Sequence, residues 1–566
     1  MHGGQLISKI LKKQGVKYLF TLCGGHISPI LVGAKQEGIR VIDVRHEANA
    51  VFAADAVSRL SGTPGVAAVT AGPGLTNTIT AVKNAHLAQS PLILFGGATA
   101  TVLKGRGSLQ DINQMKLMNP HVKWATTIKR YKDIAPKVEK AFRISQSGVP
   151  GPVFIECPID LLYGEYTVRE WYGNSSTNTL IGKIQQQYLE HHLNNMFASK
   201  EYTLEDKITA EYQQHSYADI NDVQKLLKKS ERPLLLIGSQ AMLRTNAVEK
   251  LAEKVEKLNI PVYLSGMARG LLGPTQPLQL IHKRKDALKE ADLVILAGVP
   301  CDFRLNYGQH IKSTYVSINI SKPDLYKNKK PNKAILADPN QFLQELATYA
   351  QNNNPNWLQH LQKRDSKQSK KMSATKTKTK INPISLFKEL NSQLSDNSII
   401  IADGGDFVAT GSYILQPRRP LSWIDPGVFG TLGVGAGFAL GAKLCHPESE
   451  VWIIYGDGSS AYSLQEYDTF VRHKTPIISV IGNDACWSQI ARDQIKALKD
   501  EVATNLKHSD YHLIAKAYGG DGKKVETIED FIKTVKTAKA KAKKGTPYII
   551  NAIIGKTNFR QGSISM

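Results

Sequence analysis

The chain has 566 residues, of which 42% are hydrophobic and 21% are charged, and its formal net charge at pH 7 is +23. This length predicts roughly three to four domains, and the composition is typical of a globular α/β protein. No apolar run is long enough to cross a membrane and no secretory h-region opens the chain, so we expect an intracellular protein. The five cysteines lie far apart without a CxxC pair, which argues against a disulfide framework or a zinc site.

Much of the positive charge is concentrated in one polar segment. Residues 363–380 contain eight Lys or Arg and a single Asp, with no aromatic residue among them. A surface that stacks nucleic-acid bases needs aromatic side chains, so we interpret residues 351–382 as a solvated basic linker. The remaining positive charge suits an acidic ligand such as a CoA ester as well as it suits RNA.

Residues 1–165 alternate short apolar runs with helical patterns. Strands are expected at 18–23, 39–44, 66–70, 92–97 and 153–156, and helices around 6–11 and at 48–60. Three of these strands lead directly into the segments Gly24–His26, Arg45–Glu47 and Ala71–Asn77. Repeated strand–helix units with glycine turns at the strand ends predict a doubly wound parallel sheet, with its site at the carboxyl edge.

Two less regular regions frame a second α/β pattern. Residues 166–222 are polar and irregular, and we interpret them as a linker that carries a helix near 184–197. Residues 223–350 resume the alternation, with strands expected at 234–238, 262–265, 293–298 and 315–320. A second parallel sheet is therefore predicted here.

Residues 383–566 form a third α/β block. Strands at 398–402, 451–455 and 476–481 lead into Asp403–Asp406, Gly456–Ser459 and Asn483–Cys486. A glycine turn between a strand and a helix aims backbone N–H groups at a phosphate. The carboxylate of Asp457, which lies between two such glycines, would repel this phosphate unless a divalent cation lay between them. Because parallel strands end at the same edge of a sheet, Asp457 and Asp484 can meet around one ion. Two side-chain oxygens, a backbone carbonyl and phosphate oxygens would complete the octahedron that Mg²⁺ prefers. The candidate side-chain ligands of the metal are Asp457, Asn483 and Asp484.

The run GDGS, followed about two dozen residues later by the pair Asn483–Asp484, resembles the signature of the thiamine-diphosphate (ThDP)-dependent enzymes. The resemblance implies that Asp457, Asp484 and the carbonyl of Cys486 hold the metal. It also implies three doubly wound parallel-sheet domains: a pyrimidine-binding domain (1–165), a Rossmann-like middle domain (223–350) and a diphosphate-binding domain (383–566). ThDP would bridge the first and third domains across subunits, so a homodimer or homotetramer is expected.

The N-terminal block carries the family's first-domain motifs, RHEANAVFAADAVSRLSG and TAGPGLTN. By this resemblance Glu47 hydrogen-bonds N1′ of the aminopyrimidine and promotes ylid formation, as a carboxylic acid in an apolar pocket can share its proton with a ring nitrogen. His26 is expected to polarise a substrate oxygen or move protons, although a buried histidine without a chemical role explains the pattern equally well. Gln110 matches a position that faces the reaction centre.

The resemblance also assigns cofactor contacts in the third block. The carbonyl of Gly430 would accept from the 4′-amino group, and Leu432 would be the apolar wedge that bends ThDP into its V shape. Together with Glu47, the predicted cofactor-binding residues are Gly405, Asp406, Gly430, Leu432, Gly456, Gly458 and Ser459.

The middle block separates two branches of the family. SGMARGLLG and ALKEADLVILAGVPCDFRLNYG are similar to the 2-hydroxyacyl-CoA lyases, whereas acetolactate synthases show R-F-D-D-R where this chain has Pro300–Arg304. The resemblance therefore implies a Mg²⁺-dependent lyase of fatty acid α-oxidation that cleaves 2-hydroxyacyl-CoA to a shortened aldehyde and formyl-CoA, with an ADP or CoA moiety or FAD in the middle domain. Relatives are held at the endoplasmic reticulum by a membrane-spanning N-terminus, so a cytoplasmic and a reticulum-associated location both stay open. The alternatives are an acetolactate synthase that binds FAD and a non-catalytic scaffold for polyanions.

Overall fold

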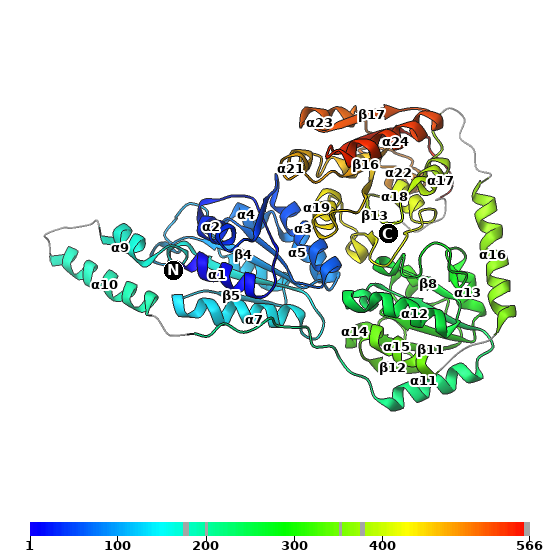
Figure 1. Cartoon of the computed structure of the whole chain (residues 1–566), viewed down its shortest axis with the longest axis horizontal. Helices are drawn as coiled ribbons and strands as arrows, with labels where there is room; N and C mark the ends of the chain where they lie inside the picture. The colour runs from blue at the N-terminus through cyan, green and yellow to red at the C-terminus, as the bar shows by residue number, and fades with distance from the viewer. Residues whose placement is uncertain (174–179, 199–201, 350–353, 374–379, 558, 560–566) are drawn as a thin grey trace. The chain divides into compact units, whose positions relative to one another are not determined.

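The structure is a computed structural model that describes residues 1–173, 180–198, 202–349, 354–373, 380–557 and 559 (Figure 1). The chain divides into two compact units, one formed by residues 1–58 and 63–211 and the other by residues 59–62 and 212–566. Within the described ranges there are three sheets of six strands each. Paired strands within each sheet run parallel, which confirms the predicted fold class.

The first unit contains a sheet with the order β2-β1-β3-β4-β6-β5. Its strands are β1 (Tyr18–Thr21), β2 (Arg40–Asp43), β3 (Gly65–Val69), β4 (Leu92–Ala98), β5 (Trp124–Thr127) and β6 (Pro152–Pro158). β3, β4 and β6 are buried along their whole length, as expected for parallel strands covered on both faces. β5 was not predicted, because its four residues are only half-buried and carry no apolar run.

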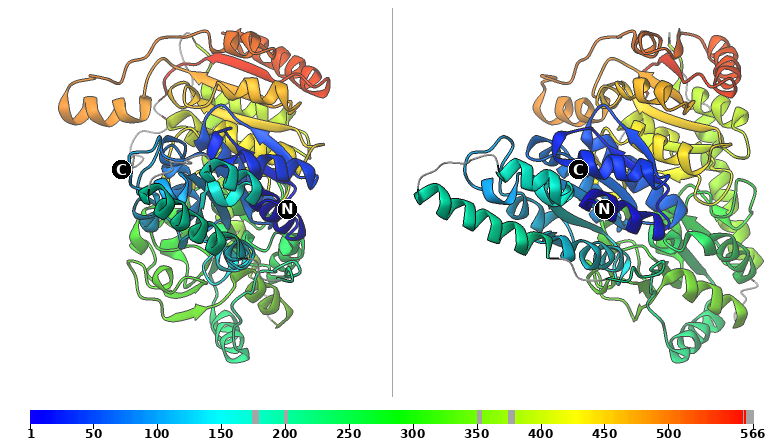
Figure 2. Two further views of the ribbon diagram at one scale, coloured as in Figure 1. Left: turned by 90° about the vertical axis from the view of Figure 1, so that its left-hand side faces the viewer. Right: turned by 60° about the vertical axis from the view of Figure 1, so that its left-hand side comes forward.

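Helices pack against this sheet through regularly spaced apolar residues. α1 (Gly3–Lys13), α2 (Ser28–Gln36) and α7 (Ile134–Gln146) share one core with alternate residues of β3, β4 and β6. The other helices that begin in this unit are α3 (Glu47–Ser61), α4 (Pro73–Thr76), α5 (Ile79–Leu87), α6 (Gln114–Met118), α8 (Ile159–Leu162), α9 (Glu165–Gly173) and α10 (Leu180–Phe197). Figure 2 shows α10, the helix predicted near 184–197, as a long helix at the periphery of this unit.

The middle sheet, in the second unit, has the order β12-β11-β10-β7-β8-β9, which is the strand order of a Rossmann fold. Its strands are β7 (Pro233–Ile237), β8 (Val262–Leu264), β9 (Gln279–Leu280), β10 (Leu293–Ala297), β11 (Thr314–Asn319) and β12 (Lys333–Leu336). The helices are α11 (Tyr217–Lys229), α12 (Val248–Leu258), α13 (Arg284–Glu290), α14 (Lys322–Leu325), α15 (Pro339–Tyr349) and α16 (Pro355–Ser373).

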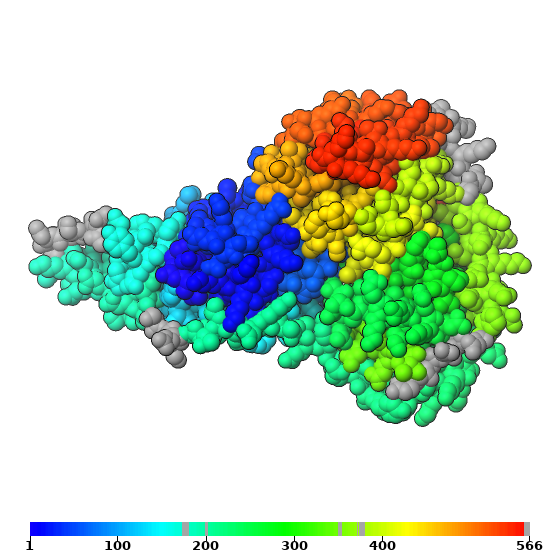
Figure 3. Space-filling model, viewed as in Figure 1, coloured from blue at the N-terminus to red at the C-terminus, as the bar shows by residue number. Residues whose placement is uncertain are grey.

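α16 differs from the predicted solvated linker. Trp357 and Leu361 are buried in the core of the middle sheet, so this part of the basic segment folds as a helix. Asp365 accepts hydrogen bonds from the backbone of Ile281 (3.0 Å) and His282 (2.6 Å). The atoms of α16 lie at the surface of the second unit (Figure 3). Residues 374–379 of the predicted linker lie outside the described residues.

The last sheet has the order β14-β13-β15-β16-β18-β17. Its strands are β13 (Ile399–Asp403), β14 (Trp423–Ile424), β15 (Val451–Gly456), β16 (Ile478–Asn483), β17 (Asp521–Val525) and β18 (Tyr548–Ile553). The helices are α17 (Pro383–Gln393), α18 (Asp406–Gly411), α19 (Gly435–Cys445), α20 (Asp457–Ser460), α21 (Glu466–Arg472), α22 (Ser488–Leu498), α23 (Tyr511–Ala517) and α24 (Ile528–Lys543). Because the chain leaves β13 toward β14 and returns as β15 on the other side, the loops after β13 and β15 meet at a switch point. Among the helices described, none is long and apolar enough to cross a membrane.

Candidate functional site

In the first unit, Glu47 is held at the beginning of α3. Its side chain is 6% exposed, and the Asn77 amide donates a hydrogen bond of 3.0 Å to its Oε2 atom. Its other oxygen faces Gly74, where an added Cβ would lie 3.6 Å from Oε1. Glu47 is therefore a buried acid at the carboxyl edge of the sheet, fixed by an amide from the loop after β3.

His26 lies in the turn after β1, beside the same loop. Its Nδ1 atom is 3.2 Å from the Thr70 hydroxyl, and burial lowers the pKa of the imidazole below its usual value. A Cβ at Gly97 of β4 would lie 2.5 Å from the Cβ of His26, so only glycine leaves room there. The ring is thus neutral at pH 7 and confined between two strand ends.

Gln110 lies against the same loop as Glu47 and His26, and the contact is made by its backbone. It has a left-handed φ of 63°, and a Cβ at Gly72 would approach its carbonyl oxygen to 2.8 Å. The three residues predicted for the N-terminal site therefore all contact the loop from Thr70 to Asn77. The structure brings them together although the sequence separates them by more than eighty residues.

A buried network of hydrogen bonds at the carboxyl edge of the first sheet was not predicted. Glu156, at the end of β6, is 1% exposed and accepts from Lys104 (2.8 Å), Thr127 (2.7 Å) and Gln114 (3.3 Å). The Gln114 amide also donates to the carbonyl of Gly97, at 3.0 Å. These contacts support the strand end on which His26 packs. The sequence signal was weak, because a glutamate that ends an apolar strand resembles an ordinary surface charge.

In the second unit, Asp457 and Asp484 form the predicted acid pair. Asp457 is 3% exposed, and its carboxylate accepts from the backbone N–H groups of Gly458 (2.8 Å) and Cys486 (3.3 Å). Burial, together with the nearby Asp484 carboxylate, raises the pKa of Asp457 to about 6. Burial also raises the pKa of Asp484, which accepts from the Ser488 hydroxyl.

This acid pair fits a divalent cation. Two buried carboxylates, one of which raises the proton affinity of the other, are stabilised by a positive ion between them. In the described part of the chain no group of three or more His, Cys, Asp or Glu side chains could hold a metal ion. A cation here would therefore need backbone and phosphate oxygens beside the two aspartates, which is the ligand set that the sequence predicts.

Asn483 is engaged elsewhere. Its Nδ2 atom donates to the carbonyl of Ser509 and to Asn551, both at 3.1 Å, and its Oδ1 atom lies 3.0 Å from His508 Nδ1. The side chain is fully buried in this network. These bonds argue against the predicted role of Asn483 as a metal ligand and favour a role in fixing the end of β16.

The glycines of the loop after β15 lie in close contacts. A Cβ at Gly458 would lie 2.4 Å from the ring of Trp487, and the Ser459 hydroxyl donates to the carbonyl of Asp403 at 2.7 Å. From the neighbouring loop, Gly405 faces Gln489, which a Cβ would approach to 2.8 Å, and Asp406 pairs with Arg492. The predicted residues Gly405, Asp406, Gly456, Gly458 and Ser459 therefore surround the switch point between β13 and β15.

Asp403 links this region to the glycine-rich loop that precedes α19. The carboxylate is fully buried and accepts from the backbone N–H groups of Gly433 (3.1 Å) and Gly435 (2.8 Å). Burial raises its pKa to about 7. Gly430 has a left-handed φ of 63°, and Leu432 is half-buried on this loop. From the sequence, Asp403 was predicted only as part of a phosphate-side loop. Its hydrogen bonds to the loop before α19 were not predicted.

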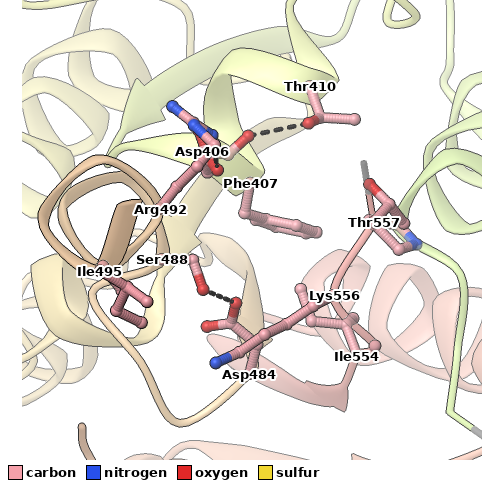
Figure 4. Close-up of a pocket in the computed structure, with 13 residues that line it drawn as sticks. Asp406, Phe407, Thr410, Asp484, Ser488, Arg492, Ile495, Ile554, Lys556 and Thr557 are labelled. Carbon is pink, nitrogen blue, oxygen red and sulfur yellow. Dashed lines mark hydrogen bonds and ion pairs between the residues drawn. The ribbon is translucent and has the colours of Figure 1, made fainter. Parts of the chain in front are cut away.

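Two cavities are lined in part by residues of α18 or of the turn that follows it. The first, of about 280 Å³, is lined by Asp406, Phe407, Thr410, Asp484, Ser488, Ala491, Arg492, Ile495, Ile554 and Lys556, among others (Figure 4). In Figure 4 the Lys556 side chain points toward Asp484. We call this the acid-pair cavity, because Asp484 stands in its wall.

The second cavity, of about 490 Å³, is bordered by Ala409 of α18, by Ser412 and Tyr413 just after that helix, and by residues of the middle sheet. Its lining includes the basic residues Arg269, Lys283, Arg284, Lys285, Arg304 and His310 and the aromatic residues Tyr263, Phe303 and Tyr413. Arg304 also pairs with Asp302, at 2.6 Å. We call this the basic cavity; its charge suits a phosphorylated ligand with an aromatic ring.

Comparison with known proteins gives three family matches along the chain. Residues 1–117 match the thiamine pyrophosphate enzyme N-terminal TPP binding domain, residues 220–346 the central domain and residues 403–552 the C-terminal TPP binding domain. A solved structure of the ThDP-dependent 4-hydroxybenzoylformate decarboxylase from Rhodococcus jostii RHA1 shares the fold, with a TM-score of 0.78 and 19% identity, covering 98% of this chain and 100% of that chain.

Full-length relatives are more similar in sequence. 2-Hydroxyacyl-CoA lyase 2 of Danio rerio is 49% identical over 583 residues, covering 100% of this chain and 93% of that protein. The human protein of the same name is 44% identical over 580 residues, covering 100% of this chain and 92% of that protein. The acetolactate synthase large subunit IlvG of Mycobacterium tuberculosis is 31% identical over 559 residues, covering 98% and 96% of the two chains.

Proposed function

Since the chain belongs to the thiamine pyrophosphate enzymes, we propose that it is a ThDP- and Mg²⁺-dependent lyase that acts on 2-hydroxyacyl-CoA. The bond between C1 and C2 of the acyl group breaks, giving an aldehyde shorter by one carbon and formyl-CoA. The substrate hydroxyl loses its proton and the formyl carbon gains one, so the reaction is redox-neutral. ThDP supplies the carbanion chemistry when it is bound.

In this proposal the first unit handles protons. Glu47, buried and fixed by Asn77, would share a proton with the aminopyrimidine ring of the cofactor. His26, neutral at pH 7, would donate to or accept from a substrate oxygen. Gln110 would donate a hydrogen bond near the same place. Their common contact with the loop from Thr70 to Asn77 supports a single site.

The second unit would hold the charged end of the cofactor. Asp457, Asp484 and the carbonyl of Cys486 would bind Mg²⁺, and the backbone around Gly456–Ser459 would face the diphosphate. Gly430 and Leu432 would contact the pyrimidine side, on the loop that Asp403 fastens. We further propose an assembly of two or four copies, which a measurement of molecular mass in solution tests.

The observation that supports a CoA substrate is the basic cavity itself, which shares α18 with the acid-pair cavity: Asp406, Phe407 and Thr410 line one cavity and Ala409 lines the other. Basic side chains favour the phosphates of CoA, and Phe303 and Tyr413 offer ring faces to its adenine. The thioester arm could then cross to the acid pair. The same cavity could receive an ADP moiety, whereas Pro300 and Phe303 depart from the R-F-D-D-R run of FAD-binding acetolactate synthases.

The test is incubation of the purified chain with a 2-hydroxyacyl-CoA and, separately, with pyruvate, each with and without ThDP and Mg²⁺. We expect formyl-CoA and a shortened aldehyde only when thioester and both cofactors are present. The second candidate, an acetolactate synthase, is favoured by the 31% identity to IlvG. It predicts acetolactate from pyruvate and a yellow, flavin-containing protein.

A further inference from the structure

One side of α22 carries a stripe of residues that leads out of the acid-pair cavity. Ser488, Ala491, Ile495 and Leu498 follow at steps of three, four and three residues, which places them on one face of the helix. The first three line the cavity, and Leu498 lies one turn further out, where its side chain is 73% exposed. At a rise of about 1.5 Å per residue, the stripe extends roughly 15 Å from Ser488 to Leu498.

The stripe becomes more apolar with distance from the acids. Ser488 hydrogen-bonds Asp484, whereas Ala491, Ile495 and Leu498 have no polar side-chain atom. Figure 4 shows Ile495 on α22, with Phe407 and Ile554 on other sides of the cavity. A ligand that leaves the acid pair along α22 therefore meets hydrocarbon surface on several sides before it reaches solvent.

The proposed substrate has matching polarity along its length. In a 2-hydroxyacyl-CoA, the phosphorylated head and the hydrocarbon tail lie on opposite sides of the bond that breaks. With the head in the basic cavity and the reacting carbons near the acid pair, the tail needs an apolar surface that leads away from both. The face of α22 from Ala491 to Leu498 provides such a surface.

We propose that Ala491, Ile495 and Leu498 bind the acyl chain and give the enzyme its preference for long 2-hydroxyacyl-CoA substrates; this inference rests on the proposed function. Each methylene that the stripe takes out of water contributes about four-fold to kcat/KM. An exposed leucine beside the cavity is then explained, because the bound chain covers it.

The experiment compares 2-hydroxybutanoyl-CoA with 2-hydroxyhexadecanoyl-CoA, using the full chain with ThDP and Mg²⁺. Ile495→Ser and Leu498→Ser should each lower kcat/KM for the long substrate about ten-fold, with the short substrate changed less than about two-fold. The matched control is Leu513→Ser on α23, which removes a leucine that is 51% exposed and not among the residues that line either cavity. It should change neither substrate.

Three outcomes would overturn the inference, and they are distinguishable. If wild type prefers the long substrate and the α22 variants keep that preference, the stripe does not bind the chain. If the variants lose activity equally on both substrates and their mass in solution falls, the stripe is a contact between copies. If wild type cleaves neither thioester, the proposed function itself fails.

Discussion

The first and last sheets of this chain share one strand order but carry different chemistry. Numbered from its own first strand, each reads 2-1-3-4-6-5. The loop after the third strand is Thr70–Asn77 in the first sheet, where hydroxyl and amide groups contact His26 and Glu47. In the last sheet the loop after the third strand contains Asp457, whose carboxylate lies near that of Asp484. In the proposed function, therefore, the same strand order holds a proton-handling group in the first sheet and a cation site in the last sheet, and the residues of the loops make the difference.

The sharpest test of this division is Glu47→Gln. We expect kcat to fall by about 10³-fold or more, because the amide cannot share a proton with the cofactor ring. The affinity for ThDP and the thermal unfolding midpoint should change little, since Gln fills the same space and can still bond Asn77. Turnover is measured as formyl-CoA release; near-normal turnover would remove Glu47 from the mechanism.

A pH prediction concerns Asp403. Its folded pKa of about 7 lies above the usual 3.8, so folding favours its protonated form. The stabilisation that this preference gives is complete below about pH 4 and is lost as pH rises through about 7, a change of about 4 kcal/mol in the free energy of unfolding. Asp403→Asn should flatten this part of the curve, as measured by denaturant unfolding of the cofactor-free protein. A slope equal to that of wild type would contradict the assignment.

Asp457→Asn should lower the affinity for the cofactor and largely keep kcat, which is the opposite of the result expected for Glu47→Gln. Removing one carboxylate of the pair should weaken binding of ThDP with Mg²⁺ by about 100-fold, since each ligand to the ion counts heavily. Quenching of Trp487, which packs on Gly458, reports binding without turnover. At saturating cofactor, kcat should recover to within about ten-fold of wild type. Unchanged affinity would mean that the acids hold no cation.

The smallest effect is expected in the basic cavity. Lys283→Ala should raise KM for the acyl-CoA about five-fold with kcat unchanged, because an exposed phosphate contact binds ground state and transition state alike. The effect should shrink at high salt. Lys322→Ala, an exposed lysine of the same domain that is not among the cavity-lining residues, is the matched control. If both variants raise KM by the same factor, the effect comes from the overall surface charge and not from a contact in the basic cavity.

The sequence predicted those parts whose signals are local. Apolar runs located the central strands of the first two sheets and three of the last sheet, although the buried interior strand β18 was missed. Asp457 and Asp484 followed from two loops at neighbouring strand ends. Short edge strands such as β5 and β9 have too few residues for a pattern. The role of Asp403 depends on backbone N–H groups thirty residues away, and that of Asn483 on bonds to Ser509 and Asn551. Such contacts exist only after folding, so periodicity and spacing cannot reveal them.

α16 is a segment that the sequence predicted as a linker and that the structure shows as a packed helix. Its lysines made a solvated linker the natural interpretation, but Trp357 and Leu361 on its inner side are buried. These two apolar residues, four positions apart, dock the helix together with the hydrogen bonds that Asp365 accepts, and the many charged residues around them concealed the pattern.

The most direct test of the account is an experimental structure of the assembled protein with ThDP and Mg²⁺. We predict a cation bound by the Asp457 and Asp484 carboxylates and the Cys486 carbonyl, with the Glu47 carboxyl group within hydrogen-bonding distance of the aminopyrimidine N1′. A bound cofactor whose diphosphate lies away from the two aspartates, or whose ring lies out of reach of every Glu47 in the assembly, would contradict it.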